Sequence, residues 1–308
     1  MSDNRSDIVE RRPKVSVSLI TYNHEKYIAE AIESALRQRT DFPFEIVVGD
    51  DGSSDATREI LDSYAQRFPD IIRLKYRDPN LGMVRNAIQT ISECAGEYIA
   101  LLEGDDYWVD DDKLQVQHDF LEKNPDCSMC YTNGASFVDG EDRSKIAIDN
   151  PPPEKFTLSY FLLNNVTLQN NTKMFRKSAH PARFPDWYFE IIQWDWVLHV
   201  YHAKCGSIGY IDRMTFMHRR HPGSVLVGGN KKEILLSAIT ANSRMNEELD
   251  FQFDSVLSDK SWYYQELLVL AFKQRDLFEI VKYLVFVFVS KPTRSLSEYR
   301  DILWRIRN

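Results

Sequence analysis

Strand and helix patterns alternate over residues 14–102, and this alternation limits the fold more than any other feature of the sequence. Short β-rich or apolar runs predict strands at residues 14–21, 45–48, 71–76 and 97–102. Apolar side chains at helical spacing predict helices at residues 25–38, 55–67 and 81–94. Strands that alternate with helices usually pair in parallel, because each helix returns the chain to the same end of the sheet. We therefore predict an α/β fold with a Rossmann-like, mostly parallel sheet flanked by helices.

The rest of the chain suggests a simple domain plan. Residues 1–12 are polar, and we expect them to be frayed. We expect one α/β domain over residues 13–228, with a first half at 13–110 and a second half at 111–228. The pattern from residue 229 to 308 is helical, which predicts a C-terminal helical extension.

Charge and cysteine content narrow the partners and the compartment. A net charge of −8 argues against nucleic acid as a partner, because a surface that follows phosphates is normally basic. Four cysteines form no dense disulfide framework, which favours a reducing, cytoplasmic location. The basic end of the helical extension and Trp304 leave two roles open for it. It could form a homo-oligomer, or it could lie on the inner face of a membrane as a peripheral contact.

Six carboxylates lie within the ten residues 103–112, directly after the fourth predicted strand. Carboxylates this close repel one another, and a divalent cation such as Mg²⁺ or Mn²⁺ would remove the repulsion. An acidic, solvated loop that caps the next helix is the alternative. Residues 21–23 and 50–51 end two other predicted strands. Since ligands of such sheets bind outside the carboxyl ends of the strands, we expect a site along this edge.

Four segments, in their order and spacing, resemble glycosyltransferase family 2, the inverting nucleotide-sugar transferases with a GT-A fold. They are LITYNHEKYI at 19–28, EIVVGDDGSSD at 45–55, NLGMVRN at 80–86 and GEYIALLEGDD at 96–106. The resemblance covers about residues 13–225 and makes the first half of the domain the donor half and the second the acceptor half. It implies a UDP-sugar donor, with dTDP- and GDP-sugars open. The implied acceptor is a hydroxyl of a glycan, a lipid-linked sugar or a cell-surface polymer precursor.

The resemblance also implies which residues bind the nucleotide. An aspartate after the second strand would accept the N3–H of the base, and an arginine would face the diphosphate. The implied set is Thr21, Tyr22, Asn23, Glu25, Asp50, Asp51 and Arg85. Turn and helix-cap chemistry is the alternative for the two aspartates, and a solvated helix position is the alternative for Arg85.

The acidic run matches the Asp-x-Asp metal motif of the family, with Glu103 in place of the first Asp. The resemblance implies Asp105, Asp106 and His221 as ligands of Mn²⁺ or Mg²⁺. Glu103 is one methylene longer than Asp, so it and Gly104 are assigned to the donor or acceptor sugar instead.

The second half of the domain supplies the remaining candidates. Asp195 opens a predicted helix beside aromatic residues and is our candidate general base; a helix-capping aspartate is the alternative. Trp194 and Asn171 could contact a sugar, although packing in the core and a polar strand edge explain them equally well. Arg219 and Arg220 could hold the diphosphate or an anionic acceptor.

These assignments predict a metal-dependent inverting glycosyltransferase. Glu103 keeps open an alternative, a catalytically silent protein that only binds a sugar nucleotide. Asp195 and His221 argue against that alternative, since a pure binding protein would need neither.

Overall fold

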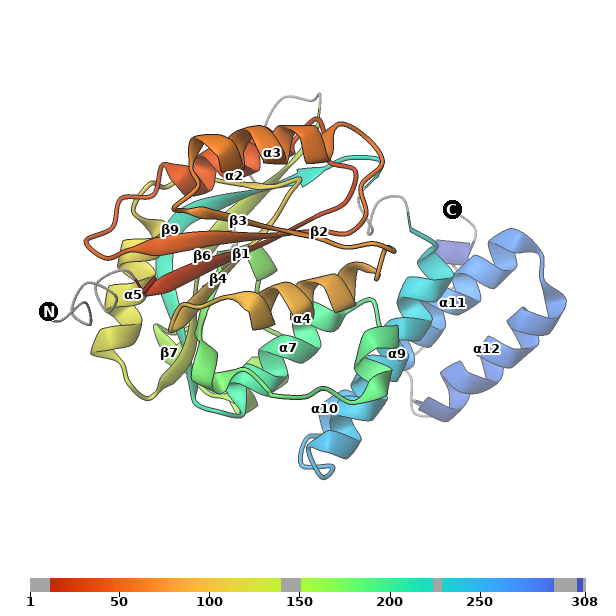
Figure 1. Ribbon diagram of the computed structural model, residues 1–308. Coiled ribbons are helices and arrows are strands. Elements are labelled where there is room, and N and C mark those ends of the chain that lie inside the picture. The colour runs from red at the N-terminus through yellow and green to blue at the C-terminus, as the bar shows by residue number, and fades with distance from the viewer. Residues whose placement is uncertain (1–11, 140–150, 224–228, 291–303, 307–308) are drawn as a thin grey trace, which may run out of the picture. The chain divides into compact units, whose positions relative to one another are not determined.

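A computed structural model describes residues 12–139, 151–223, 229–290 and 304–306 and confirms the predicted α/β fold (Figure 1). The strands are β1 (Val15–Thr21), β2 (Phe44–Asp50), β3 (Ile72–Tyr76), β4 (Tyr98–Glu103), β5 (Tyr107–Trp108), β6 (Cys127–Val138), β7 (Lys155–Phe156), β8 (Lys173–Arg176) and β9 (Ser207–Arg220). The helices are α2 (Ile28–Leu36), α3 (Thr57–Arg67), α4 (Met83–Glu93), α5 (Lys113–Lys123), α6 (Leu158–Leu163), α7 (Trp194–Ala203), α9 (Lys231–Glu248), α10 (Asp254–Leu257), α11 (Ser261–Gln274) and α12 (Leu277–Ser290). The expected frayed segment, apart from Arg12, lies outside the described residues.

The chain forms two compact units, and their division differs from the predicted boundary at residue 228. Unit 1 comprises Met1–Phe184 and Leu198–His221, and unit 2 comprises Pro185–Val197 and Pro222–Asn308. Residues 185–197 group with the helical region because hydrogen bonds tie them to α9. Ile192 N donates to Ser237 Oγ at 2.7 Å, and Gln193 Nε2 donates to the Ile234 carbonyl at 3.0 Å.

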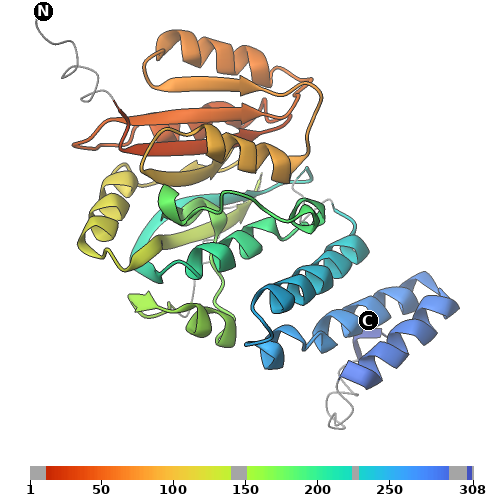
Figure 2. The same ribbon diagram turned by 60° about the horizontal axis from the view of Figure 1, so that its bottom comes forward.

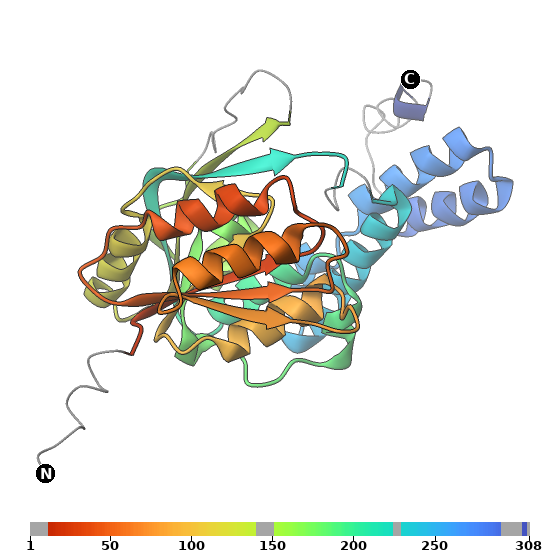
Figure 3. The same ribbon diagram turned by 45° about the horizontal axis from the view of Figure 1, so that its top comes forward.

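The sheet of unit 1 joins a parallel half to a mixed half. Its strand order is β3-β2-β1-β4-β8-β6-β9-β5, with β7 paired to β9. The pairs among β1, β2, β3 and β4 are parallel, as predicted, whereas β8 joins β4 and β6 in antiparallel pairs. Helices α2 and α3 lie on one face of the parallel half and α4 on the other (Figures 1 and 3). Because β1 is covered on both faces, its side chains are nearly all buried.

The register of the parallel strands brings their carboxyl ends together. Thr21 at the end of β1 pairs with Asp50 at the end of β2, and Ile20 pairs with Glu103 at the end of β4. Backbone hydrogen bonds extend this contact past the strands. Asp51 N donates to the Thr21 carbonyl at 2.9 Å, and Gly104 N donates to the Ile20 carbonyl at 2.8 Å. Residues 21–23, residues 50–51 and the acidic run that begins at residue 103 therefore meet at one edge of the sheet.

Unit 2 is helical over its described residues after 229, as predicted. Helices α11 and α12 form a hairpin (Figure 2), and their contact buries Leu268, Tyr283 and Val287. Leu277, Phe278, Val281 and Val289 of α12 are exposed. No helix among the described residues is long and apolar enough to cross a bilayer. Homo-oligomer formation and peripheral membrane contact by this region stay predictions.

Candidate active site

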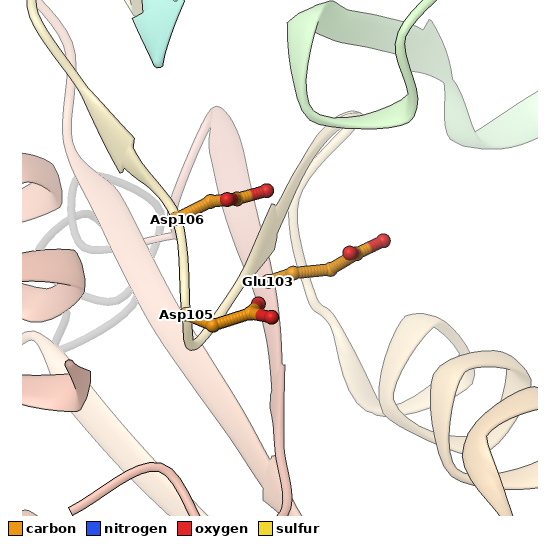
Figure 4. Close-up of side chains that lie close together, drawn as sticks. All are labelled: Glu103, Asp105 and Asp106. Carbon is orange, nitrogen blue, oxygen red and sulfur yellow. The ribbon is translucent and has the colours of Figure 1, made fainter. Parts of the chain in front are cut away.

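Three carboxylates gather at the turn between β4 and β5. One oxygen from each of Glu103, Asp105 and Asp106 lies within 4.8 Å of the others, and the three side chains extend to the same side of the turn (Figure 4). Oxygen ligands at this spacing suit a hard divalent cation. The predicted acidic motif is therefore a spatial cluster.

Asp106 is the most buried member of the cluster, with 1% of its surface exposed. Its Oδ1 accepts a hydrogen bond from the Arg219 backbone N at 2.7 Å, and its Oδ2 accepts one from Asn171 Nδ2 at 2.6 Å. Burial, followed by the charges of Asp105 and Glu103, raises the pKa of Asp106 well above its usual range. The protein thus leaves an excess of negative charge here that a cation would relieve.

Asp105 faces two imidazoles. His221 Nε2 lies 3.0 Å from Asp105 Oδ2, and His24 Nε2 lies 3.9 Å from the same oxygen. Burial raises the pKa of Asp105, but the hydrogen bond from His221 and the charge of His24 outweigh it and give a net lowering. The ring of Tyr27 packs against that of His221, with centroids 4.8 Å apart. The structure therefore places His221 beside the carboxylates, where the resemblance put it.

The guanidinium of Arg219 is held by partners within unit 1, and its contact with a diphosphate or an anionic acceptor stays a prediction. Its guanidinium pairs with Glu30 and, at 3.0 Å, with Asp139, and its Nε donates to the Asp105 carbonyl at 3.0 Å. These bonds tie the end of β9 to α2 and to the acidic turn. Arg220, the next residue, is exposed and could still meet an anion.

Asn171 lies on a 3₁₀ turn, Asn170–Thr172, and not on the strand predicted for it. Its backbone carbonyl accepts a hydrogen bond from Trp108 Nε1 at 3.1 Å, which leaves its side chain directed at Asp106. Asn170 Nδ2 donates to Glu103 Oε1 at 3.3 Å. Two amides thus hold two members of the acidic cluster. The sugar contact expected of Asn171 stays a prediction.

Asp50 is wholly buried, with 0% exposure, and its contact with a nucleotide stays a prediction. Its Oδ2 accepts hydrogen bonds from Arg58 Nε at 2.6 Å and from Ser53 N at 3.2 Å. The side chain therefore fixes the turn after β2 and neutralises the partly exposed Arg58. These contacts fit the turn alternative considered for Asp50.

Asp51 and the residues after β1 form the lining of the same edge. Asp51 Oδ1 accepts a hydrogen bond from Leu81 N at 2.7 Å, which fixes the segment before α4. Asn23 Oδ1 accepts from Ser54 N at 2.8 Å, and Glu25 Oε2 accepts from Ala56 N at 3.0 Å. Asn23 and Glu25 thus hold two loops together, and because both are exposed their nucleotide contact stays a prediction. Tyr22 is 48% exposed, so its ring is accessible from solvent.

The remaining predicted residues occupy different surroundings. Gly104 allows close packing, because a Cβ there would lie 2.7 Å from Thr21 Oγ1. Arg85 is exposed on the first turn of α4. Asp195 lies in the first turn of α7, in unit 2, and its Oδ1 accepts from Trp196 N at 2.8 Å. Trp194 is 3% exposed, which fits the core packing that was considered for it beside a sugar contact.

His24 is a residue of the candidate site that sequence reasoning missed. His24 lies in the first resembling segment, three residues after Thr21, and that proximity was the available signal. The contact of Asn170 with Glu103 could not be predicted, because it joins positions 67 residues apart in the sequence.

Solved structures with the same arrangement define the class of fold. S. aureus TarS in complex with UDP aligns over 95% of this chain and 80% of TarS, with a TM-score of 0.54 and 19% identity. Mannosyltransferase PcManGT from Pyrobaculum calidifontis, in complex with GDP-Man and Mn²⁺, aligns over 96% of this chain and 86% of its own, with a TM-score of 0.58 and 14% identity. These likenesses show that the fold is the GT-A fold of glycosyltransferases.

Sequence comparison then gives the family. The model of glycosyl transferase family 2 matches residues 16–184, more than half of the chain, and the chain therefore belongs to this family of glycosyltransferases. An uncharacterised protein of Mycobacterium tuberculosis is 36% identical over 208 residues, or 67% of this chain and 59% of that protein. TuaG of Bacillus subtilis, named as a candidate teichuronic acid biosynthesis glycosyltransferase, is 31% identical over 47% of this chain and 52% of its own. The chain thus spans less than two thirds of these relatives.

Proposed function

We propose that this glycosyltransferase is metal-dependent and inverting and that it uses a nucleoside-diphosphate sugar, with a UDP-sugar favoured. The carrying observation is the cluster of Glu103, Asp105 and Asp106, with His221 3.0 Å from Asp105, at the edge where β1, β2 and β4 end. Tyr22 and Asp51 lie along the same edge, where a nucleoside would bind. The donor set fits a divalent cation, because it combines clustered carboxylates with an imidazole.

In this proposal, different residues of the chain bind the cation and the base. Asp105, Asp106 and His221 would hold Mn²⁺ or Mg²⁺, whose chemistry is to neutralise the charge of the departing diphosphate. Tyr22 offers a ring to the base, and Asp51 offers a carboxylate oxygen to its N3–H. Asn170 and Asn171 keep the acidic cluster in place through their amides.

The transfer itself is a single displacement. The acceptor hydroxyl oxygen forms a bond to the anomeric carbon, and the bond from that carbon to the diphosphate breaks with its electron pair left on the phosphate. Asp195 would take the hydroxyl proton, since a carboxylate can act as a general base toward an attacking hydroxyl. One displacement inverts the anomeric centre.

A donor panel tests the reaction. Full-length protein is incubated with UDP-, GDP- and dTDP-sugars and Mn²⁺, and release of nucleoside diphosphate is measured with and without EDTA. We expect slow hydrolysis of one donor that EDTA abolishes. Binding of UDP or GDP without hydrolysis or transfer would instead favour the silent sugar-nucleotide-binding protein. Absence of any nucleotide binding would contradict the proposal.

Asp195→Asn tests the general base. We expect transfer to fall by about 10²- to 10⁴-fold, the usual contribution of such a group, while nucleotide affinity measured by calorimetry stays unchanged. Asp186→Asn is the matched control, because Asp186 is an exposed aspartate of the same unit. Unchanged turnover in Asp195→Asn would remove Asp195 from the mechanism.

For the acceptor we propose a glycan, a lipid-linked sugar or a cell-surface polymer precursor, used in a cytoplasmic setting. The name of TuaG, which concerns teichuronic acid, supports a polymer acceptor. Radiolabelled transfer from the donor found in the panel, onto lipid extracts and onto soluble glycans separately, would distinguish these classes.

A further inference from the structure

His24 occupies a place in the site that the proposed metal ligands do not explain. It follows β1, and its Nε2 is directed at the acidic turn, 3.9 Å from Asp105 Oδ2. His221 Nε2 approaches the same oxygen from β9's end at 3.0 Å. Imidazole nitrogens from two separate segments of the chain thus approach the same oxygen of Asp105.

The ring of His24 is held in a fixed orientation. Its Nδ1 lies 3.2 Å from Oγ1 of the buried Thr21, and its backbone N donates to Thr57 Oγ1 at 2.9 Å. Gly104 makes this arrangement possible, because a Cβ there would lie 3.0 Å from His24 Nδ1. Histidines that bind metals usually have their second ring nitrogen fixed in this way, which aims the first at the ion.

The two distances suit ligands of one ion. A separation of 3.9 Å is too long for a hydrogen bond between His24 and Asp105. Ligands about 2.1 Å from an octahedral ion lie about 3.0 Å apart when adjacent and about 4.2 Å apart when opposite. The 3.0 Å separation from His221 and the 3.9 Å separation from His24 at Asp105 Oδ2 are both within about 4.2 Å, the largest distance between two ligands that each lie about 2.1 Å from one ion.

We propose that His24 is a direct ligand of the catalytic cation, together with Asp105 and His221, and that the two imidazoles make the site favour Mn²⁺ over Mg²⁺. Imidazole nitrogens suit transition metals, whereas Mg²⁺ prefers an all-oxygen shell. This inference rests on the metal dependence of the proposed function. It adds a ligand and a metal preference that the acidic motif by itself does not give.

Pulsed electron paramagnetic resonance of bound Mn²⁺ tests the ligand directly, because its echo modulation detects coordinated imidazole nitrogens. The full chain is loaded with Mn²⁺ alone and compared with His24→Gln, His221→Gln and the double variant. We expect two coordinated nitrogens in the unchanged protein, one in each single variant and none in the double variant. Titrations should show Mn²⁺ affinity about 10- to 100-fold weaker in His24→Gln, with a smaller loss for Mg²⁺.

His218→Gln is the matched control, because His218 is an imidazole of the same β9 strand and should leave the spectrum unchanged. Thermal unfolding in EDTA checks that each variant folds. If the unchanged protein shows one coordinated nitrogen that disappears in His221→Gln and persists in His24→Gln, the inference about His24 is overturned while the metal dependence stands. Failure of the unchanged protein to bind Mn²⁺ would overturn both the inference and the metal dependence.

Discussion

Two pairs of adjacent aspartates lie along the same edge of the sheet, and their surroundings differ. Asp50 is the last residue of β2 and Asp51 follows it, whereas Asp105 and Asp106 follow β4. Arg58 neutralises Asp50, and Asp51 accepts a hydrogen bond from the Leu81 backbone. Asp106 accepts hydrogen bonds from the Asn171 amide and the Arg219 backbone N–H and lies beside two further carboxylates.

The difference teaches how a metal site can be distinguished from a structural turn. Both pairs have the same residue types at the same kind of position, so their sequence pattern is the same. Arg58 compensates the charge of Asp50, whereas burial, followed by the charges of Asp105 and Glu103, raises the pKa of Asp106. In our proposal, the turn that holds Asp106 is therefore the one that binds a cation.

Asp105→Asn should give the largest effect, because it removes a carboxylate that would bind the cation. We expect kcat/KM to fall by about 10³-fold, equivalent to the several kcal/mol that a metal contributes to the transition state. The control is Asp111→Asn, an exposed member of the same acidic run that pairs with Arg37 at 3.5 Å. Equal losses in both variants would mean that the run acts only through its total charge.

Asp50→Asn should affect stability more than chemistry. Loss of the charge-assisted bond from Arg58 should lower the free energy of unfolding by about 2 kcal/mol, since Arg58 is partly exposed and can be resolvated. Urea titration followed by circular dichroism gives this value. Unchanged stability combined with lost nucleotide binding would return Asp50 to the binding site.

Asp106→Asn should change how the free energy of unfolding of the metal-free protein depends on pH. The raised pKa of Asp106 means that the folded state holds the proton more tightly, so stability falls as pH rises from the unfolded pKa of about 3.9 through the folded value. The variant lacks this loss, and its free energy of unfolding at pH 7 in EDTA should exceed that of the unchanged protein by on the order of 1 kcal/mol. The gain should vanish below about pH 4. A variant less stable at pH 7 would contradict the account.

Asn170→Ala should have the smallest effect, because it removes one 3.3 Å hydrogen bond to Glu103. A loss of roughly threefold to tenfold in kcat/KM corresponds to the usual net value of such a bond. Asn164→Ala is the control, since Asn164 bonds only locally, to the Tyr160 carbonyl at 2.9 Å. A much larger loss would mean that Glu103 itself depends on this amide for its role.

Periodicity predicted the parallel half of the fold well because each strand and helix there repeats a local pattern that its own residues determine. The site was predicted in outline for a similar reason, since strand ends in an α/β sheet converge at one edge. The surroundings of Asn171 and Arg219 could not be predicted in this way. Their roles depend on partners such as Asp106 and Asp139, which lie far away in the sequence.

The sequence by itself determined the α/β class, the family and the edge on which the acidic motif lies, because these follow from local spacing and from contiguous motifs. Tertiary structure decided which carboxylates are compensated, which amides hold them and that His24 faces Asp105. The physical reason is that charge compensation and burial depend on neighbours brought close only by folding. The same two-aspartate pattern therefore became an ion pair with the partly exposed Arg58 at the end of β2 and a candidate cation site after β4.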